Sequence, residues 1–336
     1  MSLPTFTATT TAEEVLQAFA DQVKDKNVLI TGTSLNGIGF ETARAIAKYA
    51  NLVIITGYNA ERLKLSEEAI KKSVPSANIR PLILDLCSLA SVRKAAAEVN
   101  AYPEPLHVLI HNAAHGGGPF QLTPDGFESQ LSTAHIGPFL LTKLLAPKLL
   151  SSSSSSKYTP RVVTISSIGH AHGTGVDLDF LAHPTAEKYT NQSGYFQAKS
   201  ACILFAAEVG RRSGGRVIGF SLHPGAIYTN LMQKPENQIF MKSIESLLLN
   251  RTFCSKGALK EDGTPNDTQF PFKNMAQGAA TTVVAAFDPR IQDQPGSYLV
   301  DCVVANDQVA PHSSDPEMAK KLWDATEELL GEKFTF

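Results

Sequence analysis

A tyrosine and a lysine four positions apart are the residues of this sequence best suited to acid–base chemistry. Tyr195 and Lys199 lie in the stretch YFQAK, and on a helix such residues share one face, one turn apart. The lysine ammonium would then lie near the phenol, where a positive charge favours the phenolate form. Such a pair can exchange a proton with the oxygen of a carbonyl or an alcohol. Because the pair also arises by chance, its meaning depends on the elements around it.

A glycine-rich turn, TGTSLNGIG at residues 31–39, is the second chemical signal. It follows an apolar run that predicts a buried strand, and it leads into a predicted helix. In this context Gly32 would make the tight turn, Gly37 would let the backbone approach a phosphate, and Gly39 would let the helix pack closely on the strand. Free N–H groups at the start of such a helix attract a pyrophosphate. The turn therefore predicts dinucleotide binding.

Strand and helix patterns alternate after residue 27 and predict an α/β fold, a doubly wound parallel sheet of the Rossmann type in a single domain, residues 1–336. The predicted strands are residues 27–31, 52–56, 79–84, 106–111, 161–166 and 216–222, with 296–300 as a seventh candidate. The predicted helices are residues 12–23, 38–49, 60–72 and 89–99, a long helical region to 150, the helix that holds Tyr195 to about residue 212, and 315–330.

Three segments depart from this rhythm. Residues 1–26 form an N-terminal helical extension, and the six serines at residues 151–156 predict a flexible loop. Residues 232–272 mix an apolar helix-like piece with a polar loop. We interpret them as an insertion after the sixth strand. Ligands of this fold bind at the carboxyl ends of the strands, so the insertion is a candidate substrate lid.

The composition excludes several other classes of protein. Of 336 residues, 43% are hydrophobic and 18% charged, and the net charge of −2 gives no basic footprint for nucleic acid or acidic lipid. The four cysteines lack metal-ligand spacing and are expected to be reduced thiols. The sequence shows neither a secretory signal nor an apolar run of the ~20 residues that a membrane span needs. We therefore expect a cytoplasmic protein.

The choice of dinucleotide depends on the residues about 20 positions after the glycine turn. An acidic residue there would hold the ribose 2′-hydroxyl of NAD. Residues 56–59 read TGYN, so nothing repels a 2′-phosphate and NADP(H) is favoured over NAD(H). Arg62 and Lys64 follow in the next helix. Tyr58 could stack on adenine or could simply cap the strand.

Six motifs in order now identify a family. The sequence resembles the short-chain dehydrogenase/reductase family over essentially its whole length after residue 27, and is most similar to its retinol-dehydrogenase-like and protochlorophyllide-reductase-like members. The motifs are the turn at 31–39, LDL at 84–86, NAA at 112–114, SS at 166–167, YFQAK at 195–199, and HPG at 223–225 with Thr229. The pieces QGAATT at 277–282 and AKKLW at 319–323 also resemble that subgroup.

The resemblance implies a role for each motif. Ser167 would stabilise charge on the substrate oxygen, Tyr195 would exchange the proton, and Lys199 would assist Tyr195 and bind the nicotinamide ribose. Asp85 would bind the adenine amino group, although it could instead cap the next helix. Thr229 would bind the nicotinamide carboxamide. The predicted cofactor-binding residues are Gly32, Gly37, Ile38, Gly39, Tyr58, Asp85, Leu86, Asn112, Ala113, Tyr195, Lys199, Pro224, Gly225, Ile227 and Thr229.

One departure from the family pattern bears on the reaction. Members usually carry Asn in the long helix after the fourth strand, where it holds a water that connects the lysine to solvent; this sequence has Ala134. Thr133, His135 or a water could substitute. Alternatively, the scaffold performs non-redox chemistry as an isomerase, lyase or cyclase. The leading interpretation is an NADP-dependent oxidoreductase of carbonyls and alcohols.

The substrate is less well defined by the sequence. The segment at 232–272 and the loop between Ser167 and Tyr195 suggest a bulky, fairly apolar small molecule. His170 and His172 are a poor metal motif, and we expect no metal but a loop at the rim of the substrate pocket. A homo-oligomer is possible, because family members often are dimers or tetramers.

Overall fold

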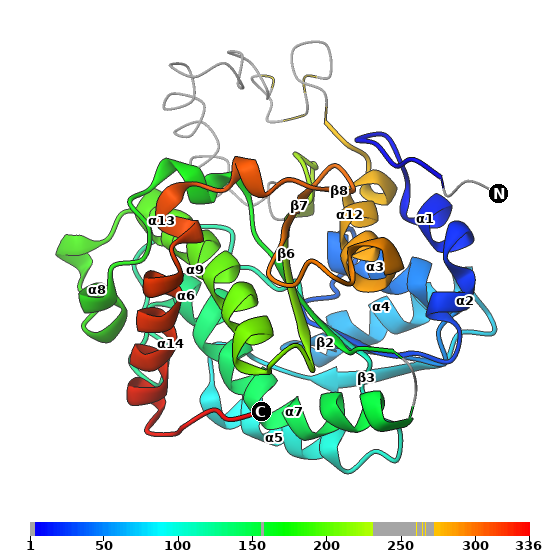
Figure 1. The fold of residues 1–336 in the computed structure, drawn as a ribbon, viewed down its shortest axis with the longest axis horizontal. Helices are drawn as coiled ribbons and strands as arrows, with labels where there is room; N and C mark the ends of the chain where they lie inside the picture. The colour runs from blue at the N-terminus through cyan, green and yellow to red at the C-terminus, as the bar shows by residue number, and fades with distance from the viewer. Residues whose placement is uncertain (1–3, 156–157, 231–259, 261–263, 265, 267–271) are drawn as a thin grey trace.

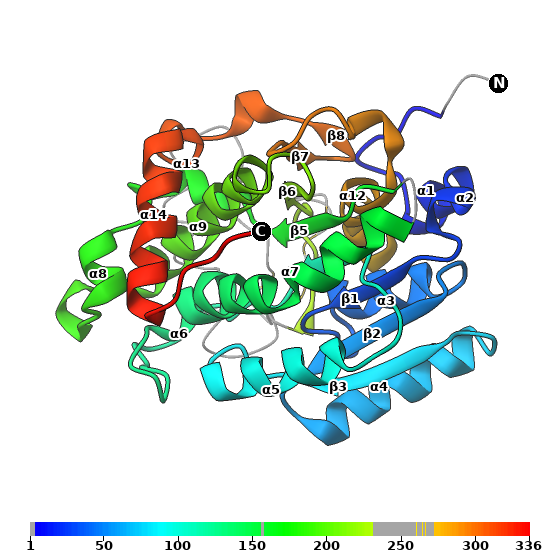
Figure 2. The same cartoon turned by 60° about the horizontal axis from the view of Figure 1, so that its bottom comes forward.

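A single eight-stranded sheet runs through the protein, with helices on both faces (Figures 1 and 2). The computed structural model describes residues 4–155, 158–230, 260, 264, 266 and 272–336. The strand order is β3 (Ile79–Ile83), β2 (Leu52–Gly57), β1 (Asn27–Ile30), β4 (Val108–His111), β5 (Arg161–Ile165), β6 (Ile218–His223), β7 (Tyr298–Val300) and β8 (Val303–Val304). All neighbouring pairs are parallel except β7 and β8. The predicted doubly wound, Rossmann-type sheet is confirmed.

The order of the strands reverses between β1 and β4, and this switch point decides where a ligand can bind. Strands β1 to β3 follow one another toward one edge, whereas β4 to β7 run toward the other. Loops from the two halves therefore leave the carboxyl edge in opposite directions and open a crevice between them. The turn after β1 and the loop after β4 flank this crevice.

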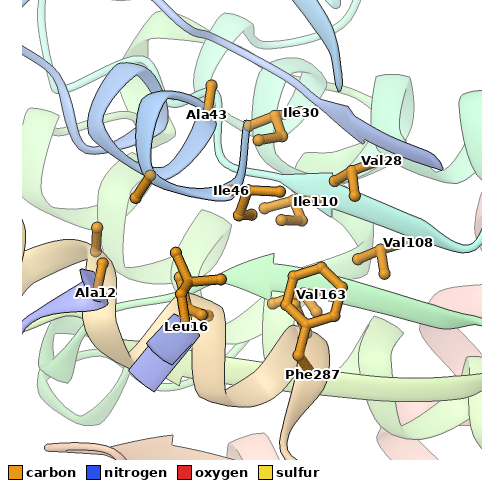
Figure 3. Close-up of a cluster of buried hydrophobic side chains, with 14 of the residues drawn as sticks. Ala12, Leu16, Val28, Ile30, Ala43, Ile46, Val108, Ile110, Val163 and Phe287 are labelled. Carbon is orange, nitrogen blue, oxygen red and sulfur yellow. The ribbon is translucent and has the colours of Figure 1, made fainter. Parts of the chain in front are cut away.

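Successive side chains of the strands point to opposite faces of the sheet, and helices bury them on both faces. On one face, Val28 and Ile30 of β1 join residues of α1 (Ala12–Ala18), α3 (Ile38–Ile46) and α12 (Met275–Phe287) in one core. Figure 3 shows this core, with Leu16 of α1 beside Phe287 of α12. On the other face, Leu29 joins a core formed with α5 (Leu89–Asn100), α7 (Gly137–Ser155) and α9 (Asn191–Arg212). Near-continuous apolar strands are typical of a sheet covered on both sides.

The N-terminal extension at residues 1–26 packs onto the domain in its described part. It forms α1 and α2 (Ala20–Val23), and the rings of Phe6 and Phe19 meet edge to face at 5.6 Å. The Arg290 guanidinium lies over both rings, 5.0 Å and 5.2 Å from their centroids. A capping box between Thr11 and Glu14 begins α1.

The carboxyl-terminal helix α14 (Pro316–Leu330) covers the outer side of α9 (Figure 1). Its Trp323 is buried between Phe139, Phe205 and Phe334, and the Arg212 guanidinium lies 4.8 Å from the Trp323 ring. The remaining described helices are α4 (Ala60–Ser73), α6 (Ser129–Leu131), α8 (Leu178–Ala182) and α13 (Pro311–Ser314), with a π-helical turn at Ser132–Ile136 and short 3₁₀ turns at Ile168–His172, Ala186–Lys188, Pro289–Ile291 and Asn306–Gln308.

Three features differ from the sequence predictions. The serine run was expected to be a loop, but α7 continues through it to Ser155, and Ser152 donates to the carbonyl of Leu149 at 2.7 Å. A serine that bonds back to its own helix does not interrupt it. Strand β8 and helix α12 were not among the predicted elements. The predicted insertion at 232–272 lies almost entirely outside the described residues.

Candidate active site

The turn after β1 is shaped by close contact with the end of β4. Gly32 has a φ of +71°, and a Cβ on it would lie 2.7 Å from the Cα of Ala113. A Cβ on Gly39 would lie 2.3 Å from Nδ2 of Asn112. Only glycine satisfies both the backbone conformation and the space at Gly32.

Asn112 is a support of this turn. Its Nδ2 donates to the carbonyls of Thr31 and Gly32 at 2.9 Å and 2.8 Å. The hydroxyl of Thr31 in turn accepts from the backbone N–H groups of Asn112 and Ala113, both at 3.0 Å. Four hydrogen bonds therefore join the ends of β1 and β4 across the crevice. The sequence predicted contact with the cofactor at Asn112 and Ala113, but not this bracing role.

The first turn of α3 presents backbone N–H groups beside that support. Gly37 is its N-cap residue, in extended conformation with a φ of −118°. Glycine has no side chain to cap the helix, and the first N–H groups of a helix have no partner within it. Together with the helix dipole they form an anion cradle. The described residues of the turn, Ile38 among them, thus fit the pyrophosphate of a dinucleotide.

A small pocket lies at the carboxyl end of β2. It is lined by Ser34, Thr56, Gly57, Tyr58, Asn59, Arg62 and Leu63. Tyr58 is 66% exposed at the rim, so its ring is open to a ligand. Asn59 caps α4 by accepting from the backbone N–H of Arg62 at 3.0 Å. An exposed arginine, a serine hydroxyl and a helix start suit an additional phosphate.

Asp85 and Leu86 follow β3 on the same side. Ser88, and not Asp85, is the N-cap residue of α5, and its side chain accepts from the N–H of Ser91. One carboxylate oxygen of Asp85 accepts from the N–H of Cys87 at 2.9 Å. Asp85 therefore folds its own turn, which removes the helix-capping alternative. Leu86 is buried, and its carbonyl accepts from Ser132.

The three predicted catalytic residues lie after β5 and in α9. A capping box of Thr190 and Ser193 begins α9. Lys199 lies one turn after Tyr195 and places its ammonium 5.5 Å from the centroid of the Tyr195 ring. Lys199 is buried, and its Nζ donates to the carbonyl of Ile165 at 2.9 Å. A buried cation with an oriented donor can act on the phenol without competition from bulk water.

The loop that follows β5 carries Ser167 toward Tyr195. Ser166 donates to the carbonyl of Lys199 at 2.7 Å, which fixes the end of β5 on α9. Two residues after Ser167, a Cβ on Gly169 would lie 2.8 Å from Cε1 of Tyr195, so the backbone lies directly on the tyrosine ring. The hydroxyl of Ser167 accepts from the N–H of Gly169 at 3.1 Å. We call Ser167, Tyr195 and Lys199 the Ser–Tyr–Lys cluster, because the loop of Ser167 packs on the Tyr195 ring and the Lys199 ammonium lies near the same ring.

His170 supports this loop from behind. Its Nε2 accepts from the N–H of Ala310 at 3.2 Å, so the proton must be on Nδ1, which donates to the carbonyl of Ser167 at 2.7 Å. Burial lowers the pKa of His170, so the imidazole is kept in this neutral form. His312 donates to the carbonyl of His170 at 2.8 Å. Within the described residues no cluster of His, Cys, Asp or Glu could hold a metal ion.

The side chains next to Ala134 do not take the place of the missing asparagine. Ala134 is buried in the π-helical turn, and its carbonyl accepts from the Cys202 thiol at 3.5 Å. Thr133 donates to the carbonyl of Ser129 at 2.8 Å. His135 bonds Thr326 of α14 at 2.8 Å. Both side chains offered as substitutes are therefore held by partners other than Lys199.

The loop after β6 completes the crevice. Pro224 is buried and Gly225 has a φ of +100°. Ile227 is buried against Gly278 of α12. Asn230, next to Thr229, donates from its backbone to the carbonyl of Asn36 at 3.4 Å and from its side chain to that of Leu35. The loop that carries Thr229 therefore reaches back to the glycine turn.

Several residues of this region escaped the sequence analysis. Asn230, Tyr298, Lys273 and Asp301 stand in no recognisable motif. Tyr298 of β7 is buried against His170, with ring centroids 5.2 Å apart, and burial, reinforced by the charge of Tyr195, raises its pKa. The spacing of these residues along the chain gave no signal, because the contacts connect separate elements.

The sheet order, the glycine cradle and the Ser–Tyr–Lys cluster together define a nucleotide-binding α/β enzyme fold, and comparison with known proteins identifies the family. A family model described as short chain dehydrogenase matches residues 26–176. The chain is 34% identical to short-chain dehydrogenase TIC 32 A, chloroplastic, of Brassica napus, over 95% of this chain and 92% of that protein. It therefore belongs to the short-chain dehydrogenase/reductase family, as the sequence motifs indicated. The narrower subgroup stays a prediction.

Other relatives are similar over comparable lengths. Short-chain dehydrogenase/reductase prx1 of Penicillium rubens is 36% identical over 92% of this chain and 86% of that protein. WW domain-containing oxidoreductase of Homo sapiens is 32% identical over 98% of this chain and 73% of that protein.

Solved structures agree on the fold. An uncharacterized protein from Mycobacterium paratuberculosis has a TM-score of 0.66 and 27% identity, covering 94% of this chain and 98% of that one. L-sorbose reductase from Gluconobacter frateurii, solved in complex with NADPH, has a TM-score of 0.58 and 17% identity, covering 82% and 94%.

No helix in the described part of the chain combines the length and apolar character needed to cross a membrane.

Proposed function

We propose that this member of the short-chain dehydrogenase/reductase family transfers hydride between NADP(H) and a carbonyl or alcohol substrate, with Tyr195 as the proton donor and acceptor. The observation that carries the proposal is the joint placement of Ser167, Tyr195 and Lys199 at the carboxyl edge of the sheet, beside the anion cradle of α3. The non-redox alternative rests on Ala134 alone and is not favoured, because the three reacting side chains are all present and clustered.

When bound, the nicotinamide supplies the hydride and accepts it back. The chain supplies the remaining steps. Ser167 would donate a hydrogen bond to the substrate oxygen and hold it beside Tyr195. Tyr195 would give its phenolic proton to that oxygen as the carbonyl carbon is reduced. The Lys199 ammonium, fixed by the carbonyl of Ile165, would stabilise the phenolate that remains. Oxidation of an alcohol would use the same positions in reverse.

The preference for NADP(H) follows from the pocket at the end of β2. No acidic side chain occurs at residues 56–59, and Arg62 and Ser34 line the pocket. An arginine and a hydroxyl can bind a phosphate, whereas a carboxylate would repel it. We assign the adenine amino group to Asp85 and the carboxamide to Thr229, as the family motifs imply.

The substrate would enter above Ser167. Ile168, the next residue, is 40% exposed and offers apolar surface beside the serine, which fits a bulky, fairly apolar substrate. The free thiols Cys87, Cys202 and Cys302 agree with a reducing compartment, and the cytosol is the compartment that we propose. Helix α14 covers the outer side of α9, so a homo-oligomer would not form its interface through that side of α9.

A direct test follows NADPH absorbance while the protein is mixed with a panel of aldehydes and ketones of increasing size. The proposal expects turnover with at least one apolar carbonyl and a preference for NADPH over NADH. Tight NADPH binding without turnover of any carbonyl, together with isomerisation or elimination of a panel member, would support the non-redox alternative instead.

A further inference from the structure

A lysine and an aspartate that no motif contains meet beside the loop after β6. Nζ of Lys273 lies 2.5 Å from a carboxylate oxygen of Asp301, and the Lys273 side chain is only 12% exposed. The backbone N–H of Lys273 donates to the carbonyl of Ala226 at 2.9 Å, and Lys273 pairs with Ile227 in a parallel bridge. Lys273 therefore contacts the loop after β6 through its backbone and forms an ion pair through its side chain.

The stem of Lys273 also occupies the space in front of Gly225. A Cβ on Gly225 would lie 2.7 Å from Cδ and 2.9 Å from Cε of Lys273. Since Gly225 has no side chain of its own, the lysine stem packs on its bare backbone at a φ of +100°. The shape of this loop thus depends on where the lysine stem lies.

Asp301 lies in a tight turn with a left-handed backbone conformation. Asp301 and Cys302 form the two-residue turn between β7 and β8, with φ values of 51° and 68°. A turn with two positive φ angles is type I′, which favours Asn-Gly, Asp-Gly or Gly-Gly, so Asp301 suits its position whereas Cys302 stands where glycine is preferred. The N–H of Cys302 donates to the Thr281 hydroxyl at 3.2 Å. Strain at a residue such as Cys302 persists where the surroundings demand it, and this turn places the Asp301 carboxylate against Lys273.

We propose that Asp301 and Lys273 form a clamp that positions residues 225–227 for the nicotinamide half of the cofactor. The inference rests on the proposed function. Both are positioning residues, because they act through the loop backbone and not on the reacting atoms. A loop held in its binding shape before the ligand arrives loses less freedom on binding. Removing the clamp should therefore weaken the binding of the whole dinucleotide and spare its adenosine half.

The test measures dissociation constants of the full chain for NADPH and for 2′,5′-ADP, which lacks the nicotinamide. Asp301→Asn and Lys273→Met should each weaken NADPH binding by about tenfold, and the double variant should be no weaker than either single one. Affinity for 2′,5′-ADP should not change. Lys71→Met, which removes the exposed pair with Glu67, is the control and should leave both constants unchanged.

Asp301→Gly separates positioning from folding. Glycine relaxes the I′ turn but removes the carboxylate, so the melting temperature should stay equal or rise while NADPH binding weakens. A melting temperature that falls in parallel with affinity would assign the pair a merely structural role and overturn the clamp. Unchanged NADPH affinity, or equal loss for 2′,5′-ADP, would also overturn it. If the unaltered chain binds no NADPH, the clamp and the proposed function both fail.

Discussion

The turn after β1 and the loop after β6 both expose backbone at the crevice, but they are held in different ways. The turn is braced by Asn112 and Thr31, which belong to the motifs at the ends of the adjacent strands β4 and β1. The loop is held by Lys273 and Asp301, from segments that follow it by tens of residues. The part of the crevice that would hold the adenosine is thus braced by residues of adjacent strands. The part that would hold the nicotinamide depends on contacts with distant segments of the chain.

The largest expected effect comes from a substitution at Tyr195, which lies away from the glycine turn. Tyr195→Phe removes the proton that the substrate oxygen needs, so turnover should fall by roughly 10²–10⁴-fold. Because the phenol lies in the part that would hold the nicotinamide, affinity for 2′,5′-ADP should stay the same. Initial rates with NADPH and the best carbonyl of the panel check this. Tyr102→Phe, in the loop before β4, is the control; full turnover by Tyr195→Phe would remove Tyr195 from the reaction.

The second prediction breaks the cradle. Gly32→Ala combines a positive φ with a collision against the Ala113 backbone, and should lower the free energy of unfolding by about 3 kcal/mol. Gly214→Ala is the matched control. Its φ is +62°, but its Cβ would meet open space within the described structure. Urea unfolding measures the loss of unfolding free energy in both variants, and the difference between the two losses is the cost of the collision with Ala113. Equal destabilisation of the two variants would show that Ala113 does not limit the space at Gly32.

The third prediction uses pH to test the part that would hold the nicotinamide. Burial, with the Lys273 ammonium adding to it, lowers the pKa of His223 from 6.5 to about 4. The folded state therefore takes up this proton at lower pH than the unfolded state does. The stability contributed by neutral His223 is present above pH 6.5 and is lost as the pH falls toward 4. Between pH 7 and pH 5 this loss is about 2 kcal/mol.

Urea unfolding at the two pH values measures this loss. His223→Gln should reduce the difference in unfolding free energy by about that amount. His183→Gln is the comparison, because the His183 side chain is exposed in the fold. An unchanged pH dependence in His223→Gln would contradict the prediction.

The smallest effect concerns the far end of the cradle. Arg62→Ala should weaken NADPH binding by about tenfold, since one charge-assisted phosphate contact is lost, and should leave NADH binding unaltered. The difference should shrink at high salt, because Arg62 is exposed. Lys64→Ala is the neighbouring control. Equal losses for NADPH and NADH would place the 2′-phosphate elsewhere.

The two parts of the crevice also differ in how far the sequence could predict them. The glycine turn and the Tyr195–Lys199 pair depend on residues a few positions apart, so periodicity and spacing were sufficient. The parallel sheet followed from the alternation of apolar strands and helices. These features are local, and local patterns carry them.

The parts that could not be predicted depend on contacts between distant segments. Nothing near Lys273 indicates that its stem would pack on Gly225, and Cys302 gives no sign of a type I′ turn, because glycine is the residue expected at its position. The Ser88 cap of α5 could have been found, since serine is a preferred N-cap residue and Ser88 directly precedes the first residue of the helix.

The most direct test of the account is a crystal structure of the protein with NADP⁺. The account predicts the pyrophosphate at the start of α3 and the 2′-phosphate beside Arg62. It also places the nicotinamide between Tyr195 and the loop at Gly225. A dinucleotide bound with its nicotinamide away from Tyr195, or bound outside the crevice between β1 and β4, would contradict it.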